Sequence, residues 1–460
     1  MSNDNSVENT VLTDKSQNSN NFEFDENTLV AAASSVEKQE LILLQWLATV
    51  EKELENISEV YLKSIQDELV KQLMRFFTYP SPKLKRPLRQ VLGRCLVFIY
   101  SKGDTSHLID TLNTLNGVTN SGKSSVDKLT RIAAIHCTGT LFESCGHKIG
   151  SYFVDTTAGL LKIIKSTSEQ YAGSIKVEAI RAIAKVIRGC GKNTPDQSLK
   201  EIVKYMKSGL CDKNFANRIA CAECLREVAS QTTYLLPSIA NDLDVLLLQI
   251  FKAFESSNYD VRREVASLVA VITATTQSPV MATASAKISI RMAKSVSFPS
   301  QSNSPTSEAG SKRDENGVFS IEETLSALSS CFSKIVTRES RVGIIETYAE
   351  LFLSLGPSFI EVNYAAISRH ILAELVGKNL TGTKLDILCV QEWCSFLLRD
   401  IIGKRLLSEQ GQVLAIRELM NTWIKSWESN GPSKFILRCV LNEVNGLILD
   451  LGGVASSVQV

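Results

Sequence analysis

The sequence predicts an all-α protein built as a solenoid of stacked helix pairs, and three observations support this prediction. A basic residue opens an apolar, helix-like segment at intervals of 42 to 50 residues, with one longer interval of 79. Within these segments, apolar residues recur at three- and four-residue steps, as on one face of an α-helix. Turn-forming residues such as Pro80-Ser81-Pro82 fall between the segments, and strand-like alternation is hard to find.

The repeated basic residues, which we call the basic ladder, indicate the type of solenoid. A period of roughly 40–47 residues is typical of HEAT and armadillo arrays, in which a helix pair buries its apolar face by stacking on its neighbours. A basic side chain at such a position can bond a turn carbonyl or an acidic residue of the adjacent repeat. We therefore interpret the ladder as structural. Its members are Arg86, Arg131, Lys176, Arg218, Arg262, Arg341, Lys384 and Lys434.

Composition along the chain predicts four regions. Residues 1–28 are polar with few large apolar side chains, so we expect a disordered tail. Residues 29–276 form the first HEAT-repeat run, beginning with the helical pattern around Trp46. Residues 277–318 are rich in serine and include Pro279, Pro299 and Pro305, which favours a linker or surface loop. Residues 319–460 form a second run without a polar capping repeat, so we expect it to be truncated and to self-associate through its carboxyl-terminal end.

Charge and hydropathy exclude several classes of protein. The 460 residues include 50 Lys and Arg against 49 Asp and Glu, so the net charge of +1 gives no broad basic field for nucleic acid. The amino terminus lacks a secretory signal pattern, and no apolar run approaches the roughly 20 residues that cross a bilayer. We expect a soluble, cytoplasmic chain that keeps its 11 cysteines reduced.

One segment matches the phosphate-loop pattern G-x-x-x-x-G-K-S through Gly117, Gly122, Lys123 and Ser124. A phosphate loop needs a buried strand before it, so that backbone amides and a helix N-terminus converge on the phosphates. The residues before Gly117 instead have the pattern of an amphipathic helix. We therefore interpret the match as a decoy and Lys123 as a loop residue between repeats.

Other candidate chemistry is also weak. Cys221 and Cys224 have metal-ligand spacing, but they lie in an Ala-rich helical segment without a second pair nearby. The chain has only four histidines, and no recognisable Ser/His/Asp or paired-carboxylate motif. We predict no metal, no cofactor, no catalytic residues and no enzymatic activity.

Several segments of the chain resemble the amino-terminal part of the HEAT repeat-containing protein 5 family. These are large accessory proteins of the clathrin adaptor that works between the trans-Golgi network and endosomes. The similarity extends over roughly residues 40–450. The segments that carry it include Gln45-Trp46-Leu47, Tyr100-Ser101-Lys102-Gly103-Asp104-Thr105 and, most specifically, Phe251-Lys252-Ala253-Phe254-Glu255-Ser256-Ser257-Asn258-Tyr259-Asp260-Val261-Arg262.

The resemblance implies a non-enzymatic scaffold in vesicle traffic, including retrograde transport from endosomes to the Golgi. Its partners would be a clathrin adaptor complex or co-adaptors, without nucleic acid. Membrane association would be peripheral, through those partners, at the trans-Golgi network and endosomes. Two alternatives remain: a HEAT scaffold of another pathway, such as a phosphatase scaffold or a transport-receptor-like array, and a P-loop nucleotide-binding protein.

Overall fold

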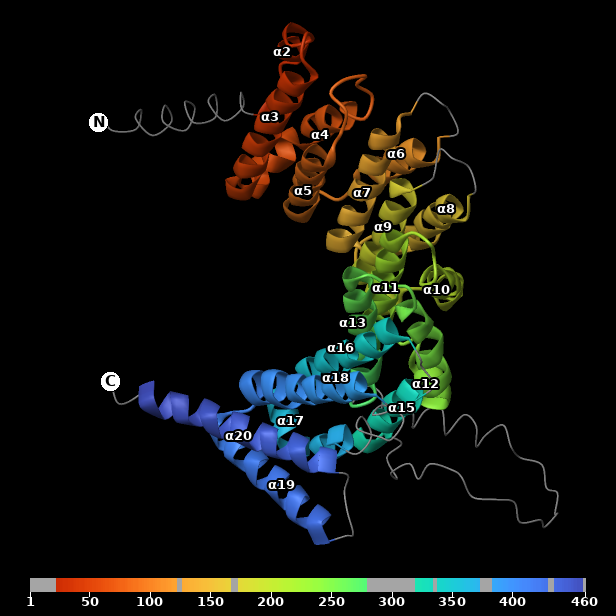
Figure 1. Ribbon diagram of the computed structural model, residues 1–460. Coiled ribbons are helices and arrows are strands. Elements are labelled where there is room, and N and C mark those ends of the chain that lie inside the picture. Colours follow the sequence, from red (N-terminus) through yellow and green to blue (C-terminus); the bar gives the residue numbers. More distant parts are fainter. Residues whose placement is uncertain are drawn as a thin grey trace, which may run out of the picture. The chain divides into compact units, whose positions relative to one another are not determined.

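The structure is a computed structural model that describes residues 22–121, 126–166, 173–278, 319–333, 337–372, 383–428 and 434–457. Every regular element in these ranges is a helix (Figure 1). The chain divides into two compact units, unit 1 (Met1–Tyr205) and unit 2 (Met206–Val460), and the boundary lies inside helix α10. The main helices of unit 1 are α2 (Glu26–Ala31), α3 (Val36–Asn56), α4 (Glu59–Arg75), α5 (Arg86–Lys102), α6 (Leu108–Asn120), α7 (Lys128–Cys145), α8 (Phe153–Lys165), α9 (Ser174–Cys190) and α10 (Asp196–Gly209).

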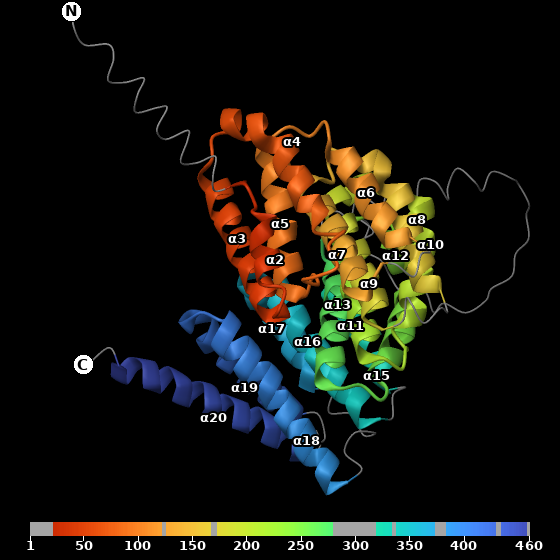
Figure 2. The same ribbon diagram turned by 90° about the horizontal axis from the view of Figure 1, so that it is seen from above.

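Unit 1 is built of two helical layers. Helices α3, α5, α7 and α9 pack on one another in chain order and form what we call the second layer. Helices α4, α6 and α8 form the first layer, and each packs on the second-layer helix that follows it. Figure 2 shows the two layers on opposite sides of the unit. Each helix pair therefore buries its apolar face against its own partner and against the next pair, which is HEAT-type stacking.

Unit 2 repeats this arrangement. Its first layer contains α12, α15, α17 and α19, and its second layer contains α11, α13, α16, α18 with its continuation η7, and α20. The chain is thus an all-α, HEAT/armadillo-type solenoid of stacked helix pairs. The bounds are α11 (Phe215–Gln231), α12 (Leu236–Phe251), η4 (Lys252–Phe254), α13 (Tyr259–Thr275), α15 (Ile321–Ser333), α16 (Arg338–Leu355), α17 (Pro357–His370), α18 (Lys384–Ser395), η7 (Phe396–Leu406), α19 (Glu409–Glu428) and α20 (Lys434–Ser457).

Local sequence explains where the helices begin and end. Ser35, Ser58 and Thr383 are N-cap residues whose side chains accept hydrogen bonds from backbone N–H groups of the first turn. Gly356 has a φ of 81°, which glycine adopts at little cost, and it joins the end of α16 to the start of α17. Pro357 then occupies the first position of α17, where no backbone N–H is needed.

The predicted tail of residues 1–28 is too long at its carboxyl-terminal end. Residues 1–21 lie outside the described part of the chain, but Phe22 is buried and the ring of Phe24 lies 5.0 Å from Trp46 and 5.4 Å from Phe76. The backbone N–H of Phe24 donates to the side chain of Gln72 at 3.1 Å. Two phenylalanines can bury enough apolar surface to offset the cost of ordering a short polar segment.

The predicted linker of residues 277–318 lies outside the described residues except for Gln277 and Ser278. Gln277 donates a hydrogen bond from Nε2 to the carbonyl of Phe319 at 3.2 Å. Next to this contact, the hydroxyls of Thr276 and Thr324 are 2.8 Å apart and buried. The two helical runs that the linker separates in sequence are therefore in contact where it leaves and rejoins them, and the stack continues from α13 to α16.

Helix α20 presents an apolar surface that leads to a prediction of self-association. Val440, Val444 and Leu447 are buried within unit 2, whereas Leu441 is 41% exposed and Ile448 is 51% exposed. Exposed apolar residues grouped on one face of a helix tend to find partners. We expect the isolated chain to associate at micromolar concentration and Leu441→Glu with Ile448→Glu to reduce that association in light scattering. A parent chain that stays monomeric, or a double variant that associates equally, would contradict this prediction.

Candidate protein-binding surfaces

The structure reveals a common position for the arginines of the basic ladder. Arg131, Arg218, Arg262 and Arg341 are each the fourth residue of a second-layer helix. All four helices follow a polar N-cap residue whose side chain accepts a hydrogen bond from the first turn. An N-cap followed four residues later by arginine therefore places a guanidinium beside the turns that connect the repeats.

Arg218 makes the most extensive of these contacts. Its side chain is buried, with 5% of the residue exposed, and burial lowers the pKa of the guanidinium, which stays protonated. One terminal nitrogen donates to the carbonyl of Ser256 at 3.3 Å, and the other donates to the carbonyls of Glu255, at 2.8 Å, and Ala253. These carbonyls lie in the short helix η4 and in the turn between η4 and α13. Arg218 thus holds the turn that leads to the next helix pair.

The other ladder arginines join their repeats in different ways. Arg131 is buried and donates to the carbonyl of Ser121 at the end of α6, at 2.8 Å. Arg262 donates to the carbonyl of Ser257 and lies 3.7 Å from the carboxylate of Glu346 on α16. Burial raises the pKa of Glu346, and the charge of Arg262 opposes that rise.

Arg341 continues the series. Its guanidinium lies 3.8 Å from the carboxylate of Asp386 on α18. An ion pair therefore links α13 to α16, and a second ion pair links α16 to α18.

The remaining ladder residues do not occupy this fourth position. Arg86 and Lys384 are exposed first residues of α5 and α18, Lys176 is half-buried, and the side chain of Lys434 lies outside the described residues. The fourth residue of α5 is Arg89, which is not among the predicted members of the basic ladder. Its side chain is 16% exposed and its guanidinium lies 3.9 Å from Glu178 on α9. The signal was available, because Arg89 precedes Arg131 by 42 residues.

A band of paired charges follows the second layer of unit 1. His136 on α7 and Glu178 on α9 form a hydrogen bond of 2.8 Å. Burial acts to raise the pKa of Glu178, but the hydrogen bond from His136 and the charges of Arg89 and Arg181 outweigh it, so the pKa is lowered. Closer to the end of α7, the carboxylate of Glu143 forms an ion pair with the ammonium of Lys185 at 3.4 Å. These pairs fix neighbouring helices in one relative position.

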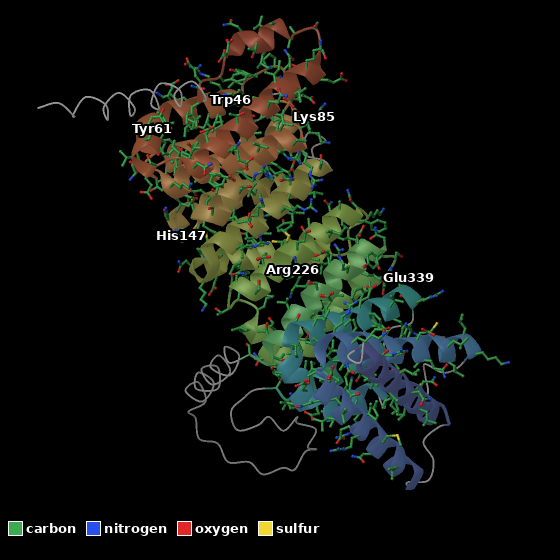
Figure 3. All side chains as sticks on the ribbon, turned by 90° about the vertical axis from the view of Figure 1, so that its left-hand side faces the viewer. Trp46, Tyr61, Lys85, His147, Arg226 and Glu339 are labelled. Carbon is green, nitrogen blue, oxygen red and sulfur yellow. The ribbon has the colours of Figure 1, made fainter. Side chains whose placement is uncertain are left out.

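A similar pair lies in unit 2. Arg226 on α11 donates to Glu264 of α13 at 3.1 Å and to the hydroxyl of Ser267 at 3.0 Å; Figure 3 labels this arginine. Because Arg226 and Glu264 are partly exposed, this pair contributes modestly to stability but adds a polar feature to the surface of the layer.

A groove in unit 1 lies between the first-layer helix α8 and helix α10. It has a volume of about 560 Å³ and a floor that includes Val154, Ala158 and Leu161. Lys165 lies beside it, with its ammonium 3.0 Å from the carboxylate of Glu201 and 4.6 Å from the ring centre of Tyr205. An apolar floor with charged groups at its edge suits a short segment of another protein.

The phosphate-loop match does not have the conformation of a phosphate loop where the structure describes it. Residues 117–120, beginning with Gly117, form the last turn of α6, so their amides bond within the helix. Gly122, Lys123 and Ser124 lie outside the described residues. The segment before the match is therefore a helix, and the interpretation of the match as a decoy stays a prediction.

The two cysteines with metal-ligand spacing are buried in helix α11. Burial raises the pKa of Cys221 to about 12 and holds the pKa of Cys224 well above its usual range, so both thiols are protonated at neutral pH. In the described part of the chain, no group of three or more His, Cys, Asp or Glu side chains is arranged to hold a metal ion. In the same part, no helix is long and apolar enough to span a membrane.

Comparisons with known proteins find distant similarity. No family model matches the chain. Protein SWEETIE of Arabidopsis thaliana is 27% identical over 179 residues, which are 39% of this chain and 8% of that protein. A chain of the Kap95:Nup1 complex aligns with 88% of this chain and 55% of its own length, at 13% identity and a TM-score of 0.44. Kap121p aligns with 91% of this chain and 38% of its own length, at 11% identity and a TM-score of 0.42.

The solenoid fold is therefore supported by the helix pairs of this chain and the way they stack. The resemblance to the HEAT repeat-containing protein 5 family stays a prediction. The matched part of this chain spans about 8% of the length of Protein SWEETIE, so activities of such a longer protein reach this chain only as proposals.

Proposed function

We propose that the chain is a non-enzymatic scaffold whose stacked helices hold short segments of partner proteins. The observation that carries this proposal is the continuous second layer in each unit, joined by Arg218, Arg262, Arg341 and the His136–Glu178 pair. Helices fixed in this way offer a long, preorganised surface, which lowers the entropic cost of binding an extended segment. The groove between α8 and α10 supports the same role.

We further propose that the partners are a clathrin adaptor complex or its co-adaptors, acting between the trans-Golgi network and endosomes. The support for this finer proposal is the resemblance of segments such as residues 251–262 to the HEAT repeat-containing protein 5 family. In this proposal the chain is cytoplasmic and reaches membranes only through its partners.

Co-precipitation tests the choice of partner. The chain should retain a purified clathrin adaptor complex, and a fluorescent fusion should overlap markers of the trans-Golgi network and endosomes. A phosphatase scaffold or a transport-receptor-like array would instead retain partners of those pathways and leave the adaptor in solution. That result would reject the finer proposal while leaving the scaffold function in place.

A nucleotide-binding measurement tests the remaining alternative, a P-loop nucleotide-binding protein. The parent chain and Lys123→Ala should both show no heat of ATP binding in calorimetry, because residues 117–120 are helical. ATP binding by the parent that is lost in Lys123→Ala would reinstate the phosphate-loop interpretation.

A further inference from the structure

A polar groove of about 350 Å³ lies in unit 2 between α18, with its continuation η7, and α20. We call it the α20 groove. Residues from both sides line it, and the argument uses Glu392, Ser395, Arg399, Asn442, Glu443 and Gly446. The described residues of this groove are predominantly polar, unlike the floor of the α8–α10 groove. Its volume is large enough for one long side chain and too small for a folded element.

The single arginine that lines the groove is already neutralised. Arg399 donates from Nε to Asp450 at 3.1 Å and from a terminal nitrogen to the other oxygen of that carboxylate at 3.3 Å. This bidentate pair lowers the pKa of Asp450, so the carboxylate is ionised at neutral pH. Because Arg399 and Asp450 balance each other, Glu392, together with Glu443 when it is ionised, gives the groove surplus negative charge.

Glu443 is the unusual group in this groove. Only 2% of the residue is exposed, and one of its carboxylate oxygens, Oε2, has no hydrogen-bond partner among the described residues. Burial raises the pKa of Glu443 to about 7; Ser395 and Arg399 oppose the rise, and Asp400 and Glu392 add to it. A buried acceptor without a donor costs folding free energy, so such a group usually has a reason to be kept.

Further groups face Glu443 from the elements packed around it. The hydroxyl of Tyr364 on α17 is also buried without a partner among the described residues. Burial raises the pKa of this phenol, as do the charges of Glu443 and of Glu418 on α19. On α18, a hydrogen bond with the thiol of Cys439, together with burial, holds the pKa of Cys394 well above its usual range. None of these groups supplies a positive charge to the free oxygen.

The backbone beside the groove departs from a regular α-helix. η7 is a π-helix of 11 residues, and the N–H of Leu407 donates to the carbonyl of Ile402 at 3.0 Å, five residues earlier. Such segments are rare and occur frequently at functional sites. Arg399 belongs to this segment, and its side chain lies directly against Gly446 of α20. A Cβ atom added at Gly446 would lie only 2.9 Å from the arginine side chain, so the close approach depends on glycine.

We propose that the α20 groove binds a lysine or arginine side chain from a segment of a partner protein, with the cation bonded to the free oxygen of Glu443. This proposal rests on the scaffold function and names the chemistry of one of its sites. The amide side chains of Asn442 and Asn445 line the same groove and supply further acceptors. Arg399 lies over Gly446 with its side chain one-third exposed, so it is the side chain that moves when the ligand enters.

A peptide library displayed on phage tests the proposal without assuming the residues that flank the basic side chain. The full chain, Glu443→Gln and the matched control Glu409→Gln each select from the same random library. Both variants remove one negative charge, but Glu409 is exposed on α19, away from the residues that line the groove. The parent and Glu409→Gln should enrich peptides with lysine or arginine at one position, and Glu443→Gln should not.

Affinity measurements on a selected peptide complete the test. Fluorescence anisotropy should show at least about tenfold weaker binding to Glu443→Gln, and to a peptide in which the basic residue is replaced by norleucine. Because Glu443 must be ionised, binding to the parent should also be roughly tenfold weaker at pH 6 than at pH 8, and this difference should disappear in Glu443→Gln.

The contrary outcomes separate the two proposals. Peptides that bind the parent and Glu443→Gln equally, or that do not need their basic residue, would overturn the groove proposal and leave the scaffold function intact. A parent chain that selects no peptide above bare resin would reject both. Circular dichroism should show the same helical spectrum for all three proteins, so that loss of binding cannot be attributed to unfolding.

Discussion

Replacing Arg218 by alanine should lower the free energy of unfolding by about 2–4 kcal/mol, the largest loss expected from any ladder residue. The guanidinium donates to three carbonyls of the turn before α13 while almost fully buried, and alanine would leave these acceptors without donors and open a cavity. Arg218→Lys should recover less than half of the loss, because an ammonium cannot reach the three carbonyls with a planar fork. Urea denaturation followed by circular dichroism measures both effects.

The control for this prediction is an exposed arginine on α13 that is not part of the basic ladder. Arg263 is exposed and pairs with Glu264 at the surface, so Arg263→Ala should leave the denaturation midpoint essentially unchanged. Because a solenoid can unfold in parts, the comparison uses the transition that contains α11 and α13. An equal loss in both variants, or a loss below about 1 kcal/mol in Arg218→Ala, would mean that the turn is held by other contacts.

Glu443→Gln should stabilise the chain above neutral pH, by up to about 3 kcal/mol. The pKa of Glu443 is raised from 4.5 in the unfolded chain to about 7 in the folded one. Between these values the folded state holds the proton and the unfolded state has lost it, so the stability of the parent falls as the pH rises from about 4.5 to about 7. Glutamine does not ionise, and this part of the pH dependence should be absent from the variant.

Chemical denaturation at pH 5 and pH 8 measures this effect. The parent should lose stability between the two values, and Glu443→Gln should lose less, with Glu409→Gln as a control that keeps the behaviour of the parent. If the parent and Glu443→Gln show the same pH dependence, Glu443 is ionised in the folded state at little cost. A residue that destabilises the folded chain is often kept because it has a function. The expected cost of Glu443 is therefore consistent with a binding role in the α20 groove.

Most of the fold could be predicted from the sequence because it depends on local signals. Apolar spacing and N-cap residues such as Asn214 and Asn258 act within one or two helical turns, so they can be recognised without knowing what packs on the helix. The ladder arginines were found for the same reason. The sequence does not distinguish Arg86 from Arg89, because both are basic and less than one helical turn apart. Arg86 opens α5, whereas Arg89 faces a neighbouring helix.

Contacts between distant residues decided the rest. Phe22 and Phe24 lie in a polar segment. Phe22 is buried, and the ring of Phe24 packs on the rings of Trp46 and Phe76, which come from distant parts of the sequence. Glu443 also has nothing unusual among its sequence neighbours.

The positions of the helices and of the turn-binding arginines thus followed from local patterns, since helical periodicity and capping are properties of short segments. The α20 groove was decided by tertiary packing. Arg399 and Asp450 are 51 residues apart, and Glu443 is buried because α20 packs on α18, η7 and α19. Burial and the pKa of a carboxyl group depend on the charges and the dielectric around it, and these exist only once the distant segments have come together.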